Sequence, residues 1–261
     1  MNTIKIIKIG GNIIDNEKKL DQFLKDFSDL KGDKILIHGG GKIATELGET
    51  LGIRAQMIDG KRVTDAETLK IVTMVYAGLI NKNIVAKLQS LHCNAIGLTG
   101  ADANIIPATK RKDSNVDWGF VGDVESSKLK LQNLKVLLDN GMVPVFCALT
   151  HDGEGNLLNT NADTIASSIA SALAISGKEV SLVYCFEKKG VLTDVNDDNS
   201  VIKQINLTYY NQLKMNGIVN KGMIPKLDNA FRSIAEGVKE VKICMAEDLN
   251  DFQNAGSTIS K

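Results

Sequence analysis

The stretch IIKIGGNII, residues 6–14, begins as an apolar run and places Lys8 just before two glycines. A second stretch, KILIHGGGKIATEL at 34–47, has the same order: an apolar run, three glycines and then a helical pattern. Glycines leave their backbone amides unshielded because they carry no side chain, and such amides bind anions. The two stretches therefore predict two strands that end in glycine loops facing a negatively charged group.

Apolar runs rich in β-branched residues alternate with helical patterns along the rest of the chain. The expected strands lie at 3–9, 34–38, 94–98, 143–148, 180–185 and 240–244, and the expected helices near 17–30, 42–51, 66–91, 131–139, 161–176, 206–216 and 223–236. Right-handed crossovers would join these strands into a mainly parallel sheet with helices on both faces and ligands at the carboxyl ends of the strands. The predicted fold class is α/β, an open, mostly parallel sheet in a three-layer αβα arrangement.

Composition indicates an ordinary globular protein. The 261 residues are 43% hydrophobic, and 31 basic residues balance 31 acidic ones, so no overall field favours nucleic acid or an acidic membrane surface. The four cysteines are far apart and form no Cys-x-x-Cys pair, which predicts buried reduced thiols rather than disulfides or zinc ligands. Uncharged runs fall short of the roughly 20 apolar residues of a membrane helix, and Lys5 and Lys8 interrupt any signal peptide. We expect a cytoplasmic protein.

The three-glycine stretch is open to rival interpretations. GGGKIA at 39–44 fits the dinucleotide fingerprint G-x-G-x-x-A, with Asp59 as a possible ribose ligand. HGGG at 38–41 matches the oxyanion loop of lipases, but no serine has glycine at both minus two and plus two, so the nucleophile elbow is missing. The Walker pattern does not occur. A lysine beside unshielded amides, as at residues 8–11, instead suits phosphate oxygens.

Two irregular segments, at 100–128 and 186–203, interrupt the alternation. The first contains TKRKDSNVDWGFVGD at 109–123, whose charges and glycines flank short apolar pieces. This pattern is typical of a mobile hairpin or lid, and equally of a solvated surface loop.

Six motifs resemble, in order and context, those of the N-acetylglutamate kinases of the amino-acid kinase superfamily. They are KIGGN at 8–12, IHGGGK at 37–42, GKRVTD at 60–65, GFVGDVESS at 119–127, NTNADTIAS at 159–167 and KGMIPKLDNA at 221–230. The resemblance implies phosphoryl transfer from ATP to the γ-carboxylate of N-acetyl-L-glutamate, the second step of arginine biosynthesis. It also implies a single domain, 1–261, with an eight-stranded sheet, an N-lobe of about 1–150 for the acyl amino acid and dimerisation, and a C-lobe of about 151–261 for ATP.

The matched motifs also imply roles for single residues in the phosphoryl transfer. Lys8 and Lys226 resemble the two lysines that neutralise the transferring phosphoryl group, and Asp163 resembles the carboxylate that holds both lysines in place. Gly11 and Gly40 resemble the amide donors to that group. A carboxylate acceptor is already ionised at neutral pH, so the reaction needs no general base. Lysines, amides and a Mg²⁺ ion bound with ATP suffice, and no protein metal cage is expected.

The amino-acid pocket implied by the resemblance consists of Gly40, Gly41, Arg62 and Asn159. The planar fork of Arg62 suits bidentate capture of the α-carboxylate of the substrate. On the nucleotide side, the family usually has a Ser/Thr-Asp-Val-x-Gly turn, whereas this chain reads FEKKG at 186–190. The implied nucleotide contacts are therefore Lys8, Gly10, Gly11, Lys226 and Glu187, which stands in the place of the aspartate.

The sequence leaves the identity of the acceptor substrate and the oligomeric state partly open. N-succinylglutamate is an alternative substrate, as are the other acceptors of the superfamily: carbamate, aspartate or a nucleoside monophosphate. Arginine-inhibited hexamers of the family carry an extra N-terminal helix, and a first strand that begins by about Ile4 leaves no room for one. We therefore expect a homodimer that is insensitive to arginine. The apolar positions Leu69, Val72, Met74, Tyr76 and Leu79 are candidates either for the dimer face or for the core of the chain.

Overall fold

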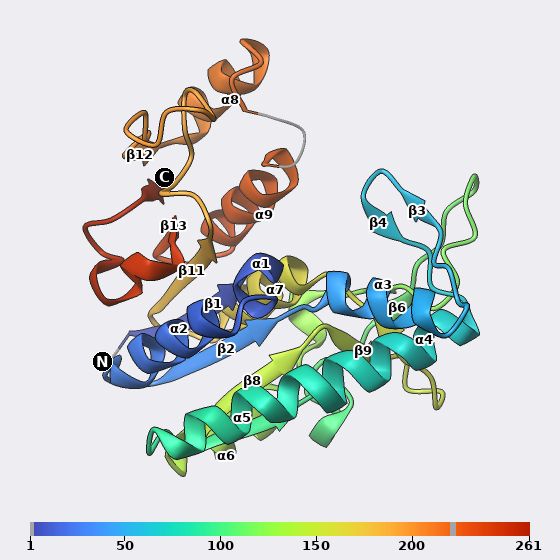
Figure 1. Ribbon diagram of the computed structural model, residues 1–261. Coiled ribbons are helices and arrows are strands. Elements are labelled where there is room, and N and C mark those ends of the chain that lie inside the picture. Colours follow the sequence, from blue (N-terminus) through green and yellow to red (C-terminus); the bar gives the residue numbers. More distant parts are fainter. Residues whose placement is uncertain (1–2, 220–222) are drawn as a thin grey trace. The chain divides into compact units, whose positions relative to one another are not determined.

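The computed structural model describes residues 3–219 and 223–261. An eight-stranded sheet has the order β12-β14-β13-β11-β1-β2-β8-β5 (Figure 1). Contacts along the backbone divide the chain into two compact units. The first consists of Met1–Ile35 and Ala166–Lys261, and the second of Leu36–Ile165. This division differs from the expected single cut near residue 150, because the first strand joins the C-terminal part of the chain. Strand β2 (Lys34–His38) contributes residues to both units.

The first unit is built around two fully parallel strand pairs. β1 (Ile4–Ile9) pairs with β11 (Val180–Phe186), and β11 pairs with β13 (Glu240–Met245). Every residue of β11 is buried, which is why its sequence is one continuous apolar run rather than an alternating one. The edge is closed by β14 (Ser257–Ile259), antiparallel to β13, and β12 (Gln204–Ile205), parallel to β14.

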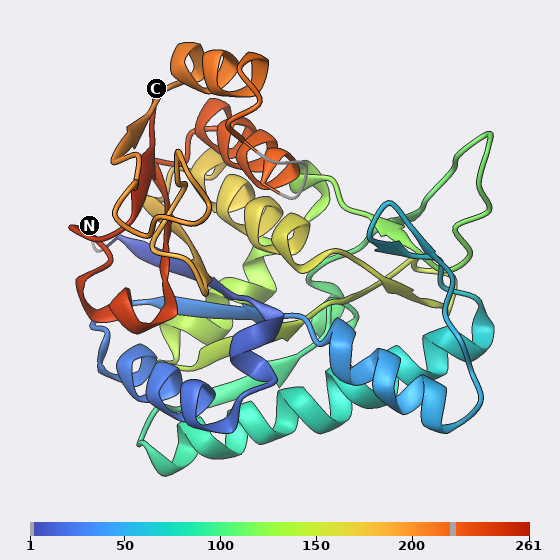
Figure 2. The ribbon, with the colours of Figure 1, turned by 45° about the horizontal axis from the view of Figure 1, so that its top comes forward.

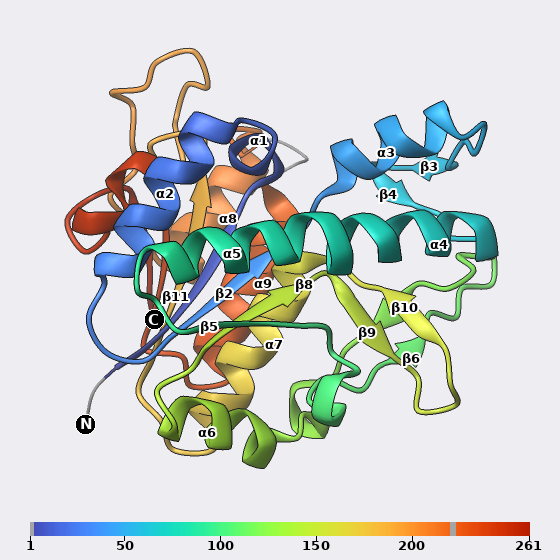
Figure 3. The ribbon, with the colours of Figure 1, turned by 60° about the horizontal axis from the view of Figure 1, so that its bottom comes forward.

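Helices cover both faces of this part of the sheet. Figures 2 and 3 show α2 (Glu17–Asp29) on one face and α9 (Ile224–Ala235) on the other. The side chain of Asn16 caps the start of α2, and Lys34 Nζ donates to three carbonyls at its end, where a cation opposes the helix dipole. The remaining helical elements are α1 (Gly11–Ile14), α7 (Ala162–Ile175), α8 (Leu207–Met215) and η4 (Ala246–Asp251).

In the second unit, β2 pairs in parallel with β8 (Val143–Cys147), and β8 pairs in parallel with β5 (Ala95–Leu98). One long helix crosses a face of these strands, with α6 (Leu131–Asp139) on the other (Figure 3). It consists of α4 (Ala66–Thr73), the π-helical turn η1 (Met74–Ile80) and α5 (Asn81–Ser90). Asp65 begins it by accepting a hydrogen bond from the Thr68 amide. Helix α3 (Gly41–Thr50) packs against α4.

Three short hairpins extend from the second unit beyond its strands. They are β3 (Met57–Ile58) with β4 (Lys61–Arg62), β6 (Thr109–Lys110) with β7 (Gly122–Asp123), and β9 (Leu149–His151) with β10 (Leu157–Asn159). Single 3₁₀ turns lie at η2 (Asp102–Asn104) and η3 (Ser126–Lys128). In Figures 1 and 2 the β3–β4 hairpin lies beside the loop that joins β6 to β7.

Two expectations from the sequence concern residues of this unit. Asp59 and Gly60 form the two-residue turn of the β3–β4 hairpin, both with positive φ, which is the Asp-Gly pattern of a tight hairpin turn. The structure thus gives Asp59 a role in reversing the chain. In the candidate dimer face, Val72 and Tyr76 are buried within the chain, whereas Met74 and Leu79 are exposed.

The stretch Ala66–Ser90 is the one described helix that is long and apolar enough, by length and composition, to cross a membrane. Residues buried against the rest of the unit, such as Ile71, Val75 and Ile84, alternate along it with exposed positions. This pattern is that of a helix packed on a sheet. All four cysteines are buried and free, as the sequence predicts.

Candidate active site

The first unit gathers the residues that the sequence assigns to phosphate binding. Lys8 lies opposite Tyr184 near the carboxyl end of β1, and 9% of its surface is exposed. Gly10 follows directly after the strand, and its amide donates to the Cys185 carbonyl over 3.0 Å. A Cβ added to Gly11 would meet nothing within 4 Å, so the first turn of α1 begins in open space. The strand end is thus fixed, and the amide that follows it is left accessible to a ligand.

Lys226 reaches the same place from the opposite end of the sequence. It lies in the first turn of α9. Pro225 lies in the same turn, where proline is well tolerated because the amide it lacks would have no partner within the helix. Its Nζ lies 3.6 Å from the centre of the Phe186 ring, and Lys8 Nζ lies 5.3 Å from the same centre. The structure therefore brings together the two lysines that the sequence paired.

Glu187 contacts the glycine turn directly. Its Oε1 accepts a hydrogen bond of 2.8 Å from Asn12 Nδ2, which ties the segment after β11 to the segment after β1. Of the two lysines that follow, Lys188 contacts Asp198 and the Val195 carbonyl, while Lys189 is exposed. The carboxylate at position 187 is accordingly a neighbour of the turn that the sequence predicts to bind phosphate.

The second unit gathers the residues assigned to the amino acid. Arg62, at the end of β4, donates through Nη2 to the Gly41 carbonyl and to Thr45 Oγ1, each over 2.8 Å. This places the guanidinium at the first turn of α3. Gly40 has to be a glycine, because a Cβ there would lie 2.2 Å from Ile80 Cδ1 and 3.1 Å from the Tyr76 ring. The three-glycine loop is therefore packed tightly against the π-helical turn.

His38 fixes the orientation of this loop. Its Nδ1 lies 2.8 Å from the Gly39 carbonyl, and its Nε2 lies 3.0 Å from Asn81 Nδ2. Burial, aided by nearby Lys82, lowers the pKa of the imidazole to about 4. The ring is therefore neutral at pH 7, with Nδ1–H donating to Gly39 and Nε2 accepting from Asn81. In a trans peptide the carbonyl and the next amide point in opposite directions, so the Gly40 N–H points away from His38.

Three of the sequence motifs meet at Thr64. Its amide donates to the Trp118 carbonyl over 3.1 Å, and its carbonyl accepts from the Phe120 amide. Asn159 donates through its side chain to Thr64 Oγ1 over 2.9 Å, and its amide donates to the Phe120 carbonyl. Hydrogen bonds thus link the GKRVTD, GFVGD and NTNAD motifs. Arg62 belongs to the first motif and Asn159 to the last.

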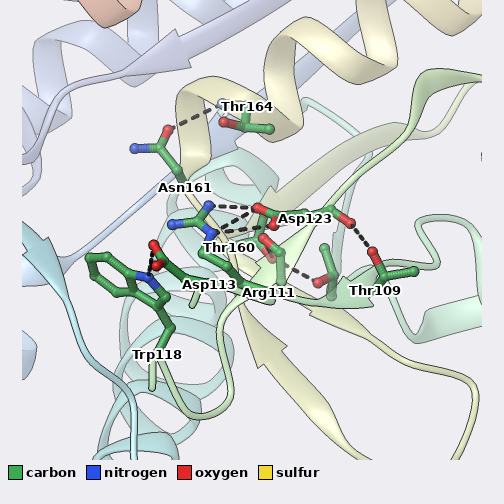
Figure 4. A network of polar contacts seen from close by, with 10 residues as sticks. Thr109, Arg111, Asp113, Trp118, Asp123, Thr160, Asn161 and Thr164 are labelled. Carbon is green, nitrogen blue, oxygen red and sulfur yellow. Dashed lines mark hydrogen bonds and ion pairs between the residues drawn. The ribbon is translucent and has the colours of Figure 1, made fainter. Parts of the chain in front are cut away.

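The predicted hairpin at 109–123 is confirmed as the β6–β7 hairpin, and polar contacts hold it (Figure 4). Arg111 Nε donates to Asp123 Oδ1 over 3.0 Å, and its guanidinium lies 5.5 Å from the centre of the Trp118 ring. The indole of Trp118 is buried and donates to Asp113. The arginine therefore links the base of the hairpin to the aromatic side chain of its loop.

Asp163 lies buried in the first turn of α7. Asn161 just before it accepts hydrogen bonds from the amides of Asp163 and Thr164, and the second contact is drawn in Figure 4. Asn161 is therefore the N-cap of α7. The role of Asp163 toward the two lysines stays a prediction.

Comparisons with known proteins agree with this geometry. The model of the amino acid kinase family matches residues 3–245. The chain belongs to the amino acid kinase family. It is 61% identical, over 99% of its length and 97% of the other protein, to the acetylglutamate kinase of Cytophaga hutchinsonii, and 38% identical, over 94% and 96%, to that of Methanopyrus kandleri. Within the family the chain is thus an acetylglutamate kinase relative along its whole length.

Solved structures share the fold. An N-acetylglutamate synthase from Neisseria gonorrhoeae, complexed with coenzyme A and N-acetyl-glutamate, superposes with a TM-score of 0.83 at 21% identity, covering 99% of this chain and 59% of that one. The smu.665 protein of Streptococcus mutans gives a TM-score of 0.76 at 25% identity and covers 98% of both chains. These likenesses support the fold of an amino acid kinase family member.

No role was assigned from the sequence to the His38–Asn81 pair or to Phe186. His38 and Asn81 act as a pair, and Asn81 lies in a helix with no local signal that it reaches the histidine. Phe186 departs from the family motif, and its contact with both lysines depends on packing between distant segments.

Burial raises the pKa of the Cys147 thiol to about 12, so this thiol carries almost no thiolate at neutral pH.

Proposed function

We propose that this acetylglutamate kinase transfers the γ-phosphoryl group of ATP to the γ-carboxylate of N-acetyl-L-glutamate, through charge and position alone. The observation that carries the proposal is the convergence of Lys8 and Lys226 on one ring, with the exposed Gly11 following the strand that carries Lys8. Two ammonium groups and unshielded amides are what a phosphoryl group needs when charge builds on its oxygens.

Each set of residues has a separate task in this proposal. Lys8, Lys226 and the Gly11 amide bind the transferring phosphoryl group, and Glu187 lies on the nucleotide side. Arg62 and Asn159 bind the α-carboxylate and backbone of the acyl amino acid, with the amides of Gly40 and Gly41 beside them. Asp163 orients the lysines. The acceptor carboxylate is the nucleophile, and it needs no base because its ordinary pKa lies near 4.

Magnesium, in this proposal, arrives bound to the phosphates of ATP. The described residues contain no group of three or more His, Cys, Asp or Glu side chains placed to hold a metal. Mg²⁺ usually keeps several waters and binds through substrate phosphates, so such a cage is not required. Chelation with EDTA should abolish turnover, and added Mg²⁺ should restore it. We also propose a cytoplasmic location, where ATP and the acyl amino acid are available.

Trapping the acyl phosphate as its hydroxamate tests the reaction. We expect ATP-dependent hydroxamate from N-acetylglutamate and little from free glutamate, whose α-ammonium group would lie unpaired in a pocket shaped for an amide. N-succinylglutamate, carbamate and aspartate complete the panel, so that the kcat/KM values rank the acceptors. Faster turnover of carbamate or aspartate than of N-acetylglutamate would refute the proposal.

Alanine variants test the division of tasks. Lys8→Ala and Lys226→Ala should each lower kcat by about 10²-fold with little change in the KM for N-acetylglutamate, because the lysines meet charge that grows in the transition state. Lys5→Ala, on the same strand, is the matched control and should keep the wild-type kcat. A wild-type kcat in Lys8→Ala would show that the strand end has no catalytic task.

Arg62 should behave differently. Arg62→Ala should raise the KM for N-acetylglutamate by about 10- to 100-fold, the range expected for losing a charge-assisted contact. Arg62→Lys keeps the charge but not the fork and should recover part of the loss. Lys61→Ala, the exposed neighbour on β4, is the control. A fall in the kcat of Arg62→Ala with an unchanged KM for N-acetylglutamate would contradict substrate binding by this residue.

We propose a homodimer formed through the exposed side of the helix at 66–90. Met74 and Leu79 are each 52% exposed there, with the exposed Gly78 between them permitting close approach of a second helix. Met74→Asp combined with Leu79→Asp should convert a dimer to a monomer in light scattering, while Met215→Asp, at an 84% exposed position, should not. A wild-type monomer or hexamer would refute the dimer.

A further inference from the structure

Phe186 ends β11 in a fixed position. Its side chain is 7% exposed, and its ring stacks on Tyr184 with 6.2 Å between centres and 13° between planes. The ring also lies close to Gly10, where an added Cβ would come 3.4 Å from Phe186 Cδ1. The ring is therefore held between its own strand and the glycine turn, with little freedom to rotate away.

The ammonium groups of Lys8 and Lys226 both lie over this ring. Lys226 Nζ lies 3.6 Å and Lys8 Nζ 5.3 Å from its centre, both within the ~6 Å range in which the negative face of an aromatic ring attracts a cation. Two like charges brought toward one site repel each other, and the ring offsets part of that repulsion. The attraction is also directional, because it favours positions over the ring rather than beside it.

An aromatic ring can add to the orientation of the lysines by Asp163. A second carboxylate contacting the ammonium groups would take up more of their N–H donors and compete with phosphate oxygens for them. A ring attracts the positive charge without accepting a conventional hydrogen bond, so it can remain in contact while a phosphoryl group binds. This chain has phenylalanine where the resembled turn begins with serine or threonine, so the ring is a feature of its own sequence.

We propose that Phe186 is a positioning residue that holds Lys8 and Lys226 in place for phosphoryl transfer through its aromatic face. The inference rests on the proposed function, in which both lysines meet the transferring phosphoryl group. It assigns a task in catalysis to the first residue of the altered FEKKG segment, beside the nucleotide contact proposed for Glu187. The ring itself touches neither substrate in this role and acts through the two lysines.

Fluorinated phenylalanines separate the electrostatic role of the ring from its shape. Each fluorine weakens the negative face while changing the volume little, so 4-fluoro-, 3,5-difluoro- and 3,4,5-trifluorophenylalanine at position 186 form a graded series. We expect kcat to fall stepwise, by about tenfold at the end of the series, which corresponds to ~1.4 kcal/mol. The KM for N-acetylglutamate should change by less than about twofold, since the lysines act mainly in the transition state.

The same series at Phe23 is the matched control. Phe23 is 1% exposed in the same unit and stacks on Phe27, so fluorination there tests general effects on packing. We expect its kcat to stay at the wild-type value. Phe186→Tyr should keep most of the activity, whereas Phe186→Leu, with similar bulk and no ring, should lose it while keeping the wild-type melting temperature within a few degrees.

Three outcomes would overturn the inference. A flat kcat across the position-186 series with an unchanged melting temperature would show that the ring only fills space. An equal fall at Phe23 would show a nonspecific effect of fluorine. Wild-type kcat values in Lys8→Ala and Lys226→Ala would refute the proposed function and this inference together, whereas large losses in those variants beside a flat fluorine series would refute the inference alone.

Discussion

Acid should destabilise the protein through His38, and the structure sets the size of the effect. The imidazole is fully buried and hydrogen-bonded at both nitrogens, and burial lowers its pKa from 6.5 to about 4. Between these two values the unfolded chain binds a proton that the folded protein excludes, so stability is fully present above pH 6.5 and is lost as pH falls toward 4. From pH 8 to pH 5 this group alone should remove about 2 kcal/mol of the free energy of unfolding.

Urea denaturation at pH 5, 6, 7 and 8 measures this loss when the wild type is compared with His38→Asn. The asparagine amide keeps a donor near the Gly39 carbonyl and has no proton to gain, so its stability should depend less on pH. We expect the variant to be less stable than the wild type at pH 8 and the difference to shrink by about 2 kcal/mol at pH 5. The comparison cancels the titration of every other group, which both proteins share.

His92→Asn is the matched control, because His92 is an exposed histidine in the same unit. It should leave the pH dependence of the wild type in place. Parallel stability curves for the wild type and His38→Asn across the four pH values would refute the argument, since they would mean that His38 gains its proton equally easily in the folded and unfolded states.

Two further predictions concern packing around the amino-acid side. Gly40→Ala should destabilise the protein by about 1–3 kcal/mol, because its new methyl group would overlap Ile80, and Ile80→Val in the same chain should recover part of the loss in thermal melts. Arg111→Ala should cost under about 1 kcal/mol of global stability, since its ion pair with Asp123 is partly exposed, yet it should speed proteolysis within 111–121. Asp123→Asn should behave likewise, and unchanged cleavage in both would show that the pair does not hold the hairpin.

The buried strands and long helices were predictable from the sequence because each is a long local pattern. β1, β2, β8 and β11 are predominantly apolar runs, and the bounds of all four lie within a residue or two of those expected. β14 was missed because a strand of three residues leaves almost no pattern in the sequence. Asp59 and Gly60 carry a local turn signal, the Asp-Gly pair, that also predicts the β3–β4 hairpin turn.

The candidate site divides in the same way. Lys8, Gly10, Gly40 and Gly41 stand at strand ends, where local sequence shows both the apolar run and the glycines that follow it. Their partners depend on contacts that no local pattern encodes: Arg62 reaches Gly41, and Asn159 reaches Thr64, only after the hairpins pack. The packing of Phe186 beneath two lysines from opposite ends of the chain is of this second kind.

Two titratable groups at the ends of the paired strands β2 and β8, His38 and Cys147, argue for catalysis by charge rather than by proton transfer. His38 is neutral at physiological pH, and both of its nitrogens are occupied by hydrogen bonds that orient the loop. Cys147, its partner in the neighbouring strand, has a pKa of about 12 and carries almost no thiolate. Neither can act as base or nucleophile without leaving its structural role. A carboxylate acceptor makes both dispensable, because it arrives already ionised. In the proposed function, the task left to the protein is to hold two anions together, which we assign to the lysines, the amides and the Phe186 ring.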